Sequence, residues 1–423
     1  MSSSHKPNNR HRVVILGAGF AGVRAALDLS RQSHGELDIV LVTDRDAHLD
    51  LTLLYEVATA YVRHESDISS EQIQSTVQLP LQSIFSGLEV DIVVQKVVRI
   101  DTAGQLLILA DDTTIDYDTL VVAVGSSLAT FDLPGVGVNT FSIKTLADAL
   151  RLRHHIVRQF WQADSLAGQA RKSALTFVVA GGGASGVEVA AELIGQIRRQ
   201  CKRHKIDPHE ITVIILEAGP RILATVTKEA AQRAHQRLTN IGVDIRLGAR
   251  ITEVTATEVR MQGGDYIYSR TTIWTAGLRP NPVLVDSGLP LDHWGVTVSP
   301  TLQVPTMPNI FMAGDAAVIT DSEPPVPATV PVAYAQGALV AKNIRHQRRG
   351  ESLEEFSYSP PGMVITLGSK VALALLPNGR YLFGLLPWLL KHFITLRYWL
   401  RLTTWGQALR LWYRSWHIHG AND

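Results

Sequence analysis

Residues 13–22 read VVILGAGFAG, an apolar run that ends in the pattern Gly17-x-Gly19-x-x-Gly22. The run predicts a buried parallel strand, and the glycines predict a tight turn into a helix. Gly17 would make the turn, Gly19 would let the backbone approach a ligand, and Gly22 would let the helix pack against the strand. Because the first N–H groups of such a helix can hold a pyrophosphate, the stretch indicates a dinucleotide site.

The residues that follow agree with this interpretation. Residues 23–30 have a helix-like pattern, and residues 39–42 form a second apolar run that leads to Asp44. A carboxylate about 20 residues beyond the glycines is where a ribose hydroxyl would be bound. A glycine turn without any ligand is the alternative.

Length, charge and cysteine count exclude several classes of protein. The chain has 423 residues, so we expect two or three domains. A net charge of +1 with 19% charged residues does not favour nucleic acid as a partner. The single cysteine, Cys201, excludes a disulfide or a redox-active cysteine pair within the chain. The polar residues 1–12 predict a loose tail and no secretory signal.

The opening pattern returns once, which is the second decisive feature of the sequence. Residues 175–188 read LTFVVAGGGASGVE, with glycines at 181, 182, 183 and 186, and the strand predicted over 211–216 is followed by Glu217. Two glycine loops, each with a carboxylate at a second strand end, predict two dinucleotides on one chain. A purely structural second loop is the alternative.

Other strands and helices are assigned by hydrophobic pattern. Residues 304–315, an apolar strand that stops at Gly314-Asp315, indicate that the chain returns to the first domain. The other strands are expected at 90–100, 106–109, 117–125, 243–246, 258–261 and 272–275, and the other helices at 146–161, 187–204, 228–239 and 332–347. Residues 66–79 read as loop or short helix.

The C-terminal stretch has a different composition. Residues 356–422 contain no Asp or Glu but five of the eight tryptophans and seven Lys or Arg. The most apolar run, 381–390, is about ten residues long, whereas a membrane-spanning helix needs about 20. Residues 407–416 predict a helix with Leu409, Trp412, Tyr413 and Trp416 on one face and Arg410 and Arg414 beside it. This composition suits a helix lying on an anionic lipid surface, and packing on its own domain or on a second subunit is the alternative.

Seven motifs in order resemble the two-dinucleotide flavoproteins of the pyridine nucleotide-disulfide oxidoreductase superfamily, and most of all the type II NADH:quinone oxidoreductases. The resemblance runs from residue 13 to the C-terminus. The motifs are GAGFAG at 17–22, LLYEVA at 53–58, residues 117–125, GGGASGVE at 181–188, LEAG at 216–219, IWTAG at 273–277 and AGD at 313–315.

The resemblance implies FAD on the first glycine loop and NADH as co-substrate on the second. Asp44 would contact the adenosine ribose of FAD, and Glu217 that of NADH, where a carboxylate disfavours the 2′-phosphate of NADPH although Arg221 is close by. The residues implied for FAD are Gly17, Gly19, Phe20, Ala21, Gly22, Asp44, Arg45, Val97, Gly125, Gly314 and Asp315. Those implied for NADH are Gly181, Gly183, Ser185, Gly186, Glu217, Ala276 and Gly277.

Glu188 corresponds to the carboxylate that this family carries near its active site, so the resemblance implies a catalytic role. A charge that interacts with the helix dipole is the alternative. In such enzymes the flavin takes hydride from NADH and passes two electrons to a quinone, without proton pumping. No nucleophile or metal is required, and the fifteen histidines are scattered.

The sequence departs from the family in three places. The family usually carries Ala-Gln at the start of the helix after Gly-Asp, but here Val330-Pro331 stand there. We therefore expect an altered quinone pocket, with Pro331, Tyr334 and Gln336 as candidate lining residues. The loop 44–53 lacks the usual aromatic and proline and is shifted by one residue, so Thr43 is an alternative to Asp44. Ala184-Ser185 stand where proline and threonine are common.

The expected fold is therefore α/β, with two Rossmann-like domains and a C-terminal membrane-associating helical region. We expect a tail at 1–11, a discontinuous FAD domain at 12–145 and 285–350, an inserted NADH domain at 146–284, and a membrane-surface or dimerisation region at 351–423. The expected protein is an NADH:quinone oxidoreductase that uses menaquinone or ubiquinone on the cytoplasmic face of a bacterial plasma membrane. It would have no transmembrane helix, and a homodimer is an option.

Two other functions stay open at this point. One is a soluble flavin reductase for oxygen or for a protein acceptor such as a ferredoxin. The other is an NADH-binding flavin sensor with poor turnover. Sulfide:quinone and disulfide reductases need catalytic cysteines that Cys201 alone cannot supply.

Overall fold

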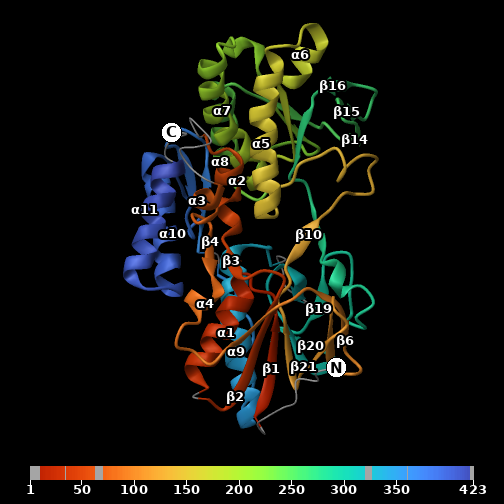
Figure 1. Cartoon of the computed structure of the whole chain (residues 1–423), viewed down its shortest axis with the longest axis vertical. Coiled ribbons are helices and arrows are strands. Elements are labelled where there is room, and N and C mark those ends of the chain that lie inside the picture. The colour runs from red at the N-terminus through yellow and green to blue at the C-terminus, as the bar shows by residue number, and fades with distance from the viewer. Residues whose placement is uncertain (1–9, 34, 62–69, 320–325, 360, 420–423) are drawn as a thin grey trace. The chain divides into compact units, whose positions relative to one another are not determined.

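The computed structural model describes residues 10–33, 35–61, 70–319, 326–359 and 361–419 (Figure 1). They fall into two compact units, which are described one at a time. The first unit runs over residues 1–49, 78–127 and 278–360, and the second over 50–77, 128–277 and 361–423. The chain leaves the first unit within β10 (Ser126–Leu128) and returns to it at β18 (Leu278–Pro280).

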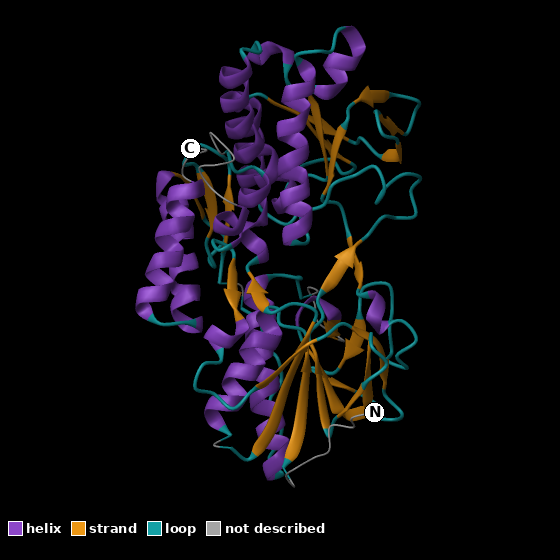
Figure 2. Cartoon of the chain, in the orientation of Figure 1, coloured by secondary structure: helices purple, strands orange, loops and turns teal. Residues whose placement is uncertain are grey.

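The first unit is built on a six-stranded sheet in the order β20-β21-β9-β1-β2-β5. All its pairings are parallel except that between β20 and β21. Helices α1 (Phe20–Gln32) and α9 (Val330–Arg349) lie side by side next to this sheet (Figure 2). The strands are β1 (His11–Leu16), β2 (Leu37–Thr43), β5 (Asp91–Val94), β9 (Thr119–Val122), β20 (Gln303–Val304) and β21 (Met307–Met312).

Smaller elements complete the first unit. Three are sheets: β3 (Ala47–Leu49) with β4 (Gln78–Pro80), β19 (Val296–Val298) with β22 (Ala317–Ile319), and the antiparallel meander β6 (Val97–Asp101), β7 (Leu106–Leu109) and β8 (Thr114–Asp116). The others are α4 (Leu81–Ile84), η3 (Pro282–Leu284) and η4 (Gly314–Ala316).

The second unit repeats the same plan with a parallel sheet in the order β13-β12-β11-β17. Its strands are β11 (Thr176–Ala180), β12 (Thr212–Glu217), β13 (Val243–Leu247) and β17 (Thr271–Trp274). The helices around it are α5 (Leu146–Ala163), α6 (Gly168–Ala174), α7 (Ala184–His204), the short η2 (Pro208–Glu210) and α8 (Lys228–Ile241).

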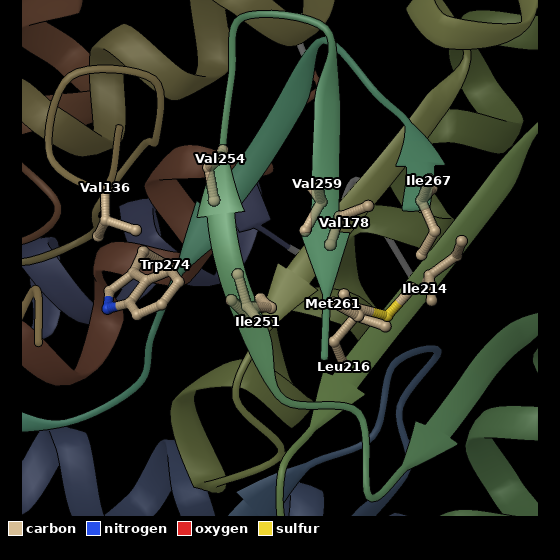
Figure 3. Packing of buried hydrophobic residues seen from close by; sticks show 11 residues of the cluster. Val136, Val178, Ile214, Leu216, Ile251, Val254, Val259, Met261, Ile267 and Trp274 are labelled. Atoms are coloured by element: carbon tan, nitrogen blue, oxygen red, sulfur yellow. The ribbon is translucent and has the colours of Figure 1, made fainter. Parts of the chain in front are cut away.

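A second, antiparallel sheet packs on this one through a buried apolar cluster (Figure 3). It consists of β14 (Ile251–Val254), β15 (Glu258–Met261) and β16 (Tyr266–Tyr268). Val178, Ile214 and Leu216 come from the parallel sheet, and Ile251, Val259 and Met261 come from the antiparallel one. The alternation of buried and exposed residues in β15 is what one apolar face on a core predicts.

The rest of the second unit comes from two distant parts of the chain. Residues 50–77 supply η1 (Leu51–Leu53), α2 (Leu54–Ala58) and α3 (Ser70–Gln74), and α2 packs on α5 and α7. The C-terminal part supplies the antiparallel sheet β23 (Met363–Thr366), β24 (Ala372–Leu375) and β25 (Tyr381–Gly384), followed by α10 (Leu385–Leu402) and α11 (Trp405–His419).

The predicted α/β class is confirmed, and the differences in detail have physical causes. Helices α1 and α7 begin three residues earlier than predicted, because Gly19 and Gly183 have extended backbone and the helix starts directly after each. Part of the predicted loop 66–79 forms α3 and β4, while residues 66–69 lie outside the described residues. The compact units differ from the expected domains, because residues 50–77, 128–145 and 361–423 group with the second glycine loop, and residues 278–284 and 351–360 with the first.

The four side chains expected on one face of the last helix lie in α11, but they have different surroundings. Leu409 and Tyr413 are exposed, but Trp412 donates its indole N–H to the His392 carbonyl at 2.9 Å and Trp416 packs on Trp388. Two of the four side chains therefore face α10, because a buried indole N–H needs an acceptor. None of the helices that the structure describes combines the length and apolarity that a membrane crossing needs.

Candidate functional site

The first glycine loop, residues 17–22, connects β1 to α1 in the first unit. Gly17 has φ +108°, and its N–H donates to the Val42 carbonyl at 2.8 Å. A Cβ on Gly17 would lie 2.4 Å from the Ala123 carbonyl oxygen, and one on Gly22 would lie 1.9 Å from the Gly17 oxygen. Gly19, in contrast, faces open space, with no described atom within 4 Å of a Cβ there. The loop is therefore closed toward the protein and open toward a ligand.

The start of α1 offers hydrogen-bond donors to that open space. Its N-cap is Gly19, and no side chain among the described residues caps it. The N–H groups of the first helical turn, at Phe20 and Ala21, have no partner within the helix. Together with the dipole of α1 they favour an anion such as a pyrophosphate.

The other residues expected around FAD lie at strand ends of the same unit. Asp44 follows β2, is largely exposed and accepts a hydrogen bond from Arg45 at 3.1 Å. Thr43, its alternative, is buried within β2. Gly125, with φ +65°, follows β9, and Val97 begins β6 with a buried side chain.

Gly314 and Asp315 form a fixed turn at the end of β21. The Ser126 hydroxyl donates to Asp315 at 2.7 Å, and the Gly314 N–H donates to the Gln336 side-chain oxygen at 2.7 Å. Gln336 is buried, so its amide oxygen holds this turn. Tyr334 instead stacks under the Arg24 guanidinium at 4.5 Å, and Pro331 is exposed in the first turn of α9. The three residues proposed from sequence for a quinone thus face different neighbours.

The second glycine loop, residues 181–186, repeats the geometry of the first in the second unit. Gly181 has φ +108°, and its N–H donates to the Leu216 carbonyl at 2.8 Å. A Cβ on Gly186 would lie 2.0 Å from the Gly181 oxygen, whereas Gly183 faces open space. No described side chain caps α7 at Gly183, and Ser185 is exposed in its first turn. The loop has the form of a second phosphate cradle.

Glu217, at the end of β12, is fixed by the backbone beside this loop. Its Oε2 accepts the Gly182 N–H at 2.7 Å and its Oε1 accepts the Gly219 N–H at 2.6 Å. The nearby Arg221 donates to the carbonyls of Ala224 and Val226 within its own loop. The carboxylate is therefore presented in one orientation while the guanidinium is committed to its own loop, an arrangement suited to ribose hydroxyls.

Ala276 and Gly277 follow β17 at the same edge of the parallel sheet. The indole N–H of Trp274 lies 2.9 Å from the carbonyl oxygens of Ala129 and Ala276. Gly277 is exposed and has φ +74°, which favours glycine. A Cβ on Gly277 would lie 2.4 Å from the Phe131 ring, so that ring packs directly against the glycine.

Glu188 lies at the start of α7, one turn after the second glycine loop. The Thr366 N–H donates to Glu188 Oε1 at 3.1 Å, and the Thr366 hydroxyl is 3.4 Å from the same oxygen. That hydroxyl is also 3.0 Å from the hydroxyl of Tyr55 in α2. Lys391 of α10 donates to the Tyr55 hydroxyl and to Glu56. These five side chains, Tyr55, Glu56, Glu188, Thr366 and Lys391, are called the Glu188 cluster below.

The protonation of the cluster is set by burial and by its opposite charges. Burial raises the pKa of Glu188 to about 7, although the Lys391 ammonium and the Thr366 N–H act in the opposite direction. Burial alone would lower the pKa of Lys391, but the carboxylates of Glu56 and Glu188 outweigh it and raise that pKa. Burial also raises the pKa of Asp50 to about 6. Glu188 can therefore gain and lose a proton near neutral pH, while Lys391 stays charged.

Sequence reasoning missed four of the five cluster residues. Glu188 was found only through the family resemblance, and Tyr55 and Glu56 were part of a quoted motif without a role. Lys391 was seen only as one cation of a basic stretch. The signal that could have found it is its place directly after the apolar run 385–390, where a lysine that is turned inward needs a carboxylate partner.

Comparisons with known proteins agree with the two-cradle architecture. A family model described as pyridine nucleotide-disulphide oxidoreductase matches residues 11–337. A type II NADH:quinone oxidoreductase of Mycobacterium tuberculosis is 32% identical, over 96% of this chain and 88% of its own length. One of Staphylococcus aureus is 29% identical, over 85% and 88%. The structure of NDH2 from Plasmodium falciparum in complex with NADH shares the fold, with a TM-score of 0.83 at 16% identity over 96% of this chain and 98% of that one.

Proposed function

The chain belongs to the pyridine nucleotide-disulphide oxidoreductase family, and within it to the type II NADH:quinone oxidoreductases, and we propose on this basis that it oxidises NADH and reduces a quinone. The overall reaction takes NADH, one proton and quinone to NAD⁺ and quinol. The observation in this chain that best supports the proposal is the Glu188 cluster. It holds a carboxyl group of near-neutral pKa within one helical turn of the second glycine loop.

FAD fits the first glycine loop. The open space at Gly19, the donors at the start of α1 and the turn at Gly314-Asp315 are what its pyrophosphate and ribityl chain need. Asp44, with Arg45 beside it, would bind the adenosine ribose, and Val97 and Gly125 would border the adenine and the flavin. When bound, FAD accepts a hydride from NADH and transfers two electrons to quinone.

NADH is assigned to the second glycine loop. The N–H groups at the start of α7 would hold its pyrophosphate, and Glu217 would accept hydrogen bonds from the adenosine ribose. A carboxylate at that position repels a 2′-phosphate, and Arg221 is occupied by its own loop, so NADH is favoured over NADPH. Ala276 and Gly277, at the end of β17 beside this loop, would border the nicotinamide.

Replacing Glu217 by alanine should weaken NADH binding while leaving the maximal rate nearly unchanged. A charged hydrogen bond contributes about 1.5–3 kcal/mol, so the KM for NADH should rise about tenfold or more. Steady-state kinetics with NADH and NADPH measure this, and Glu229→Ala, exposed on α8, is the control. An unchanged KM for NADH would remove Glu217 from the proposed site.

The Glu188 cluster is proposed to supply the proton that the quinol needs. Protonated Glu188 can donate a proton, and the Thr366 N–H, 3.1 Å from Glu188 Oε1, fixes the orientation of its carboxyl group. Lys391 stabilises the carboxylate that is left after donation. Gln336 holds the Gly314 turn and Tyr334 stacks on Arg24. We therefore propose that the quinone does not bind at these two side chains, which were its candidate lining residues from sequence.

The C-terminal helices are proposed to lie on a membrane surface. Leu386 of α10 is 66% exposed and Phe393 is 62% exposed, and Ile394 is exposed beside them. Arg397, Arg401, Arg410 and Arg414 are exposed on α10 and α11, and residues 356–422 contain no acidic side chain. An apolar helix face bordered by arginines suits the headgroup region of an anionic bilayer. NADH is available on the cytoplasmic side of a bacterial plasma membrane, so we propose that the protein binds to that side.

The purified protein should bind vesicles that contain anionic lipid, and Phe393→Asp should weaken this binding about tenfold or more because a charge must enter the interface. Co-sedimentation with phosphatidylglycerol vesicles measures the bound fraction. Val138→Asp, at an 86% exposed site of the same unit, is the matched control. If neither protein binds vesicles and the native one dimerises with rising concentration, the face serves a second subunit instead.

The proposed activity is tested by the rate of NADH oxidation of the FAD-loaded protein in lipid vesicles, with menaquinone or ubiquinone analogues as acceptors. We expect quinone to raise the rate far above that with oxygen alone. Acceleration by a ferredoxin but not by quinone would favour the soluble reductase. A rate that no acceptor raises would favour a sensor.

A further inference from the structure

A line of polar side chains continues from Glu188 along the side of α7 that is buried in the protein. Glu192, Gln196, Gln200 and His204 follow at intervals of four residues and are called the α7 polar lane. Neighbours at this spacing lie about 6 Å apart on one side of a helix. From Glu188 to His204 the rise along the helix axis is about 24 Å. The inward residues between them, such as Val189, Leu193 and Ile197, are apolar. A continuous polar line inside an apolar packing region is unusual and needs an explanation.

The middle of the lane is buried and its amides lack partners. Gln196 is 0% exposed, and neither its side-chain oxygen nor its nitrogen has a hydrogen-bond partner among the described residues. The same holds for the side-chain oxygen of the buried Gln200 and for that of Gln159 on α5, which packs on α7. Each such buried polar group costs about 1–3 kcal/mol unless it is hydrogen-bonded, and water is the usual partner.

Both ends of the lane carry groups that can exchange protons. At the inner end, the charge of Glu192 raises the pKa values of Tyr55 and Lys391, which places it in electrostatic reach of the Glu188 cluster. At the outer end, His204 Nδ1 lies 3.5 Å from a carboxylate oxygen of Asp164, whose side chain is half exposed. Gln159 directly precedes Phe160, whose ring is 6.1 Å from that of His204. Along α7 the unpartnered amides of Gln196 and Gln200 therefore lie between His204, which contacts an exposed carboxylate, and the Glu188 cluster.

We propose that the α7 polar lane holds a file of buried water that carries protons from Asp164 and His204 to Glu188. The inference rests on the proposed function, which consumes one proton per NADH oxidised and reduces quinone at a lipid-covered surface. A proton taken up at His204 passes along water held by Gln200, Gln159 and Gln196 to Glu192, and from there reprotonates Glu188. The amides hold and orient the water and do not themselves titrate.

The alternative is that the lane is only a tolerated cost of packing, and substitution by methionine separates the two. Methionine has nearly the volume of glutamine but binds no water, so Gln196→Met and Gln200→Met would interrupt the file without opening a cavity. Gln196→Glu keeps a polar side chain of the same size and should restore conduction. Gln162→Met, at an exposed position of α5, is the matched control.

The test is stopped-flow absorbance of the FAD-loaded protein in two separate half-reactions, with NADH alone and then with quinone. We expect Gln196→Met to slow the quinone half-reaction about tenfold and to increase its solvent deuterium isotope effect, while the NADH half-reaction is unchanged. The melting temperature should change little, since methionine has nearly the volume of glutamine and only hydrogen bonds to water are lost. Gln196→Glu should recover most of the rate.

Three results would overturn the inference. The first is a more stable Gln196→Met protein with unchanged rates, which makes the lane a packing cost. The second is equal slowing of both half-reactions, which indicates a structural effect. The third is a high-resolution crystal structure with no water beside Gln196 and Gln200. A native protein that reduces no quinone at all would contradict the proposed function itself, and the inference with it.

Discussion

We expect Glu188→Gln to slow quinone reduction by about a hundredfold and to leave the reaction with NADH unchanged within about twofold. The amide keeps the size of the side chain and can still accept the Thr366 N–H, but it cannot give up a proton. The fold should therefore be preserved while the proton donor is lost. Stopped-flow measurement of the two half-reactions separates these effects, and Glu355→Gln, exposed in the first unit, is the control.

The pH dependence of the same variant gives an independent readout. Burial raises the pKa of Glu188 to about 7, and the donor must be protonated, so native quinone reduction should decline as the pH rises above about 7. The variant has no such group and should show a flat profile in this range. A native profile that does not fall on the alkaline side, or a variant that keeps it, would assign the proton to another group.

We expect Lys391→Met to lower stability and to shift the pH dependence of quinone reduction, because it leaves Glu56 and Glu188 without their ammonium neighbour. Removing one partner of a buried ion pair costs about 3–5 kcal/mol of unfolding free energy, and Lys391 and Glu56 are both nearly buried. Since Lys391 lowers the pKa of Glu188, its loss should also move the alkaline decline of quinone reduction to higher pH. Thermal unfolding and pH-rate profiles measure the two effects, with the exposed Lys202→Met as control.

The double variant Glu56→Gln with Lys391→Met distinguishes the ion pair from simple packing. It removes both charges, so it should recover part of the stability lost in Lys391→Met alone. It should not recover the native pH profile, because Glu188 still lacks its cation. Additive losses in the double variant would contradict a direct interaction between Lys391 and Glu56.

The fold could be predicted from short motifs, because each motif meets a requirement of the backbone within a few residues. Gly17 and Gly181 have a positive φ, and a close carbonyl excludes a Cβ at Gly22 and Gly186. Both requirements can be recognised in the sequence from the spacing of the glycines. Both loops and the strands before them could therefore be predicted from sequence.

The Glu188 cluster could not be predicted in the same way, because it is assembled from segments far apart in the chain. Thr366 contacts Glu188 across 178 positions, and Lys391 contacts Glu56 across 335. No spacing rule links such residues. The Lys391 side chain points into the protein, while apolar side chains of the same helix are exposed. Composition does not show which way a side chain points, so it indicated only a basic stretch.

The C-terminal elements were predicted only in part from the composition of this stretch. The apolar run 381–390 is divided between two elements, since Gly384, with φ +110°, ends β25 and Pro387 lies in the first turn of α10. A proline there costs no helical hydrogen bond, so the helix continues for 18 residues. The sheet β23-β24-β25, which supplies Thr366, was not predicted from this stretch.

The most direct test of the proposed function is a single-turnover experiment on the purified FAD-loaded protein. It is mixed with one equivalent of NADH under nitrogen, and then with a menaquinone or ubiquinone analogue, while the oxidised flavin absorbance is followed. We predict rapid loss of that absorbance with NADH and rapid return with quinone, much faster than with air. Loss with NADH followed by a return that quinone does not accelerate would contradict quinone as the acceptor.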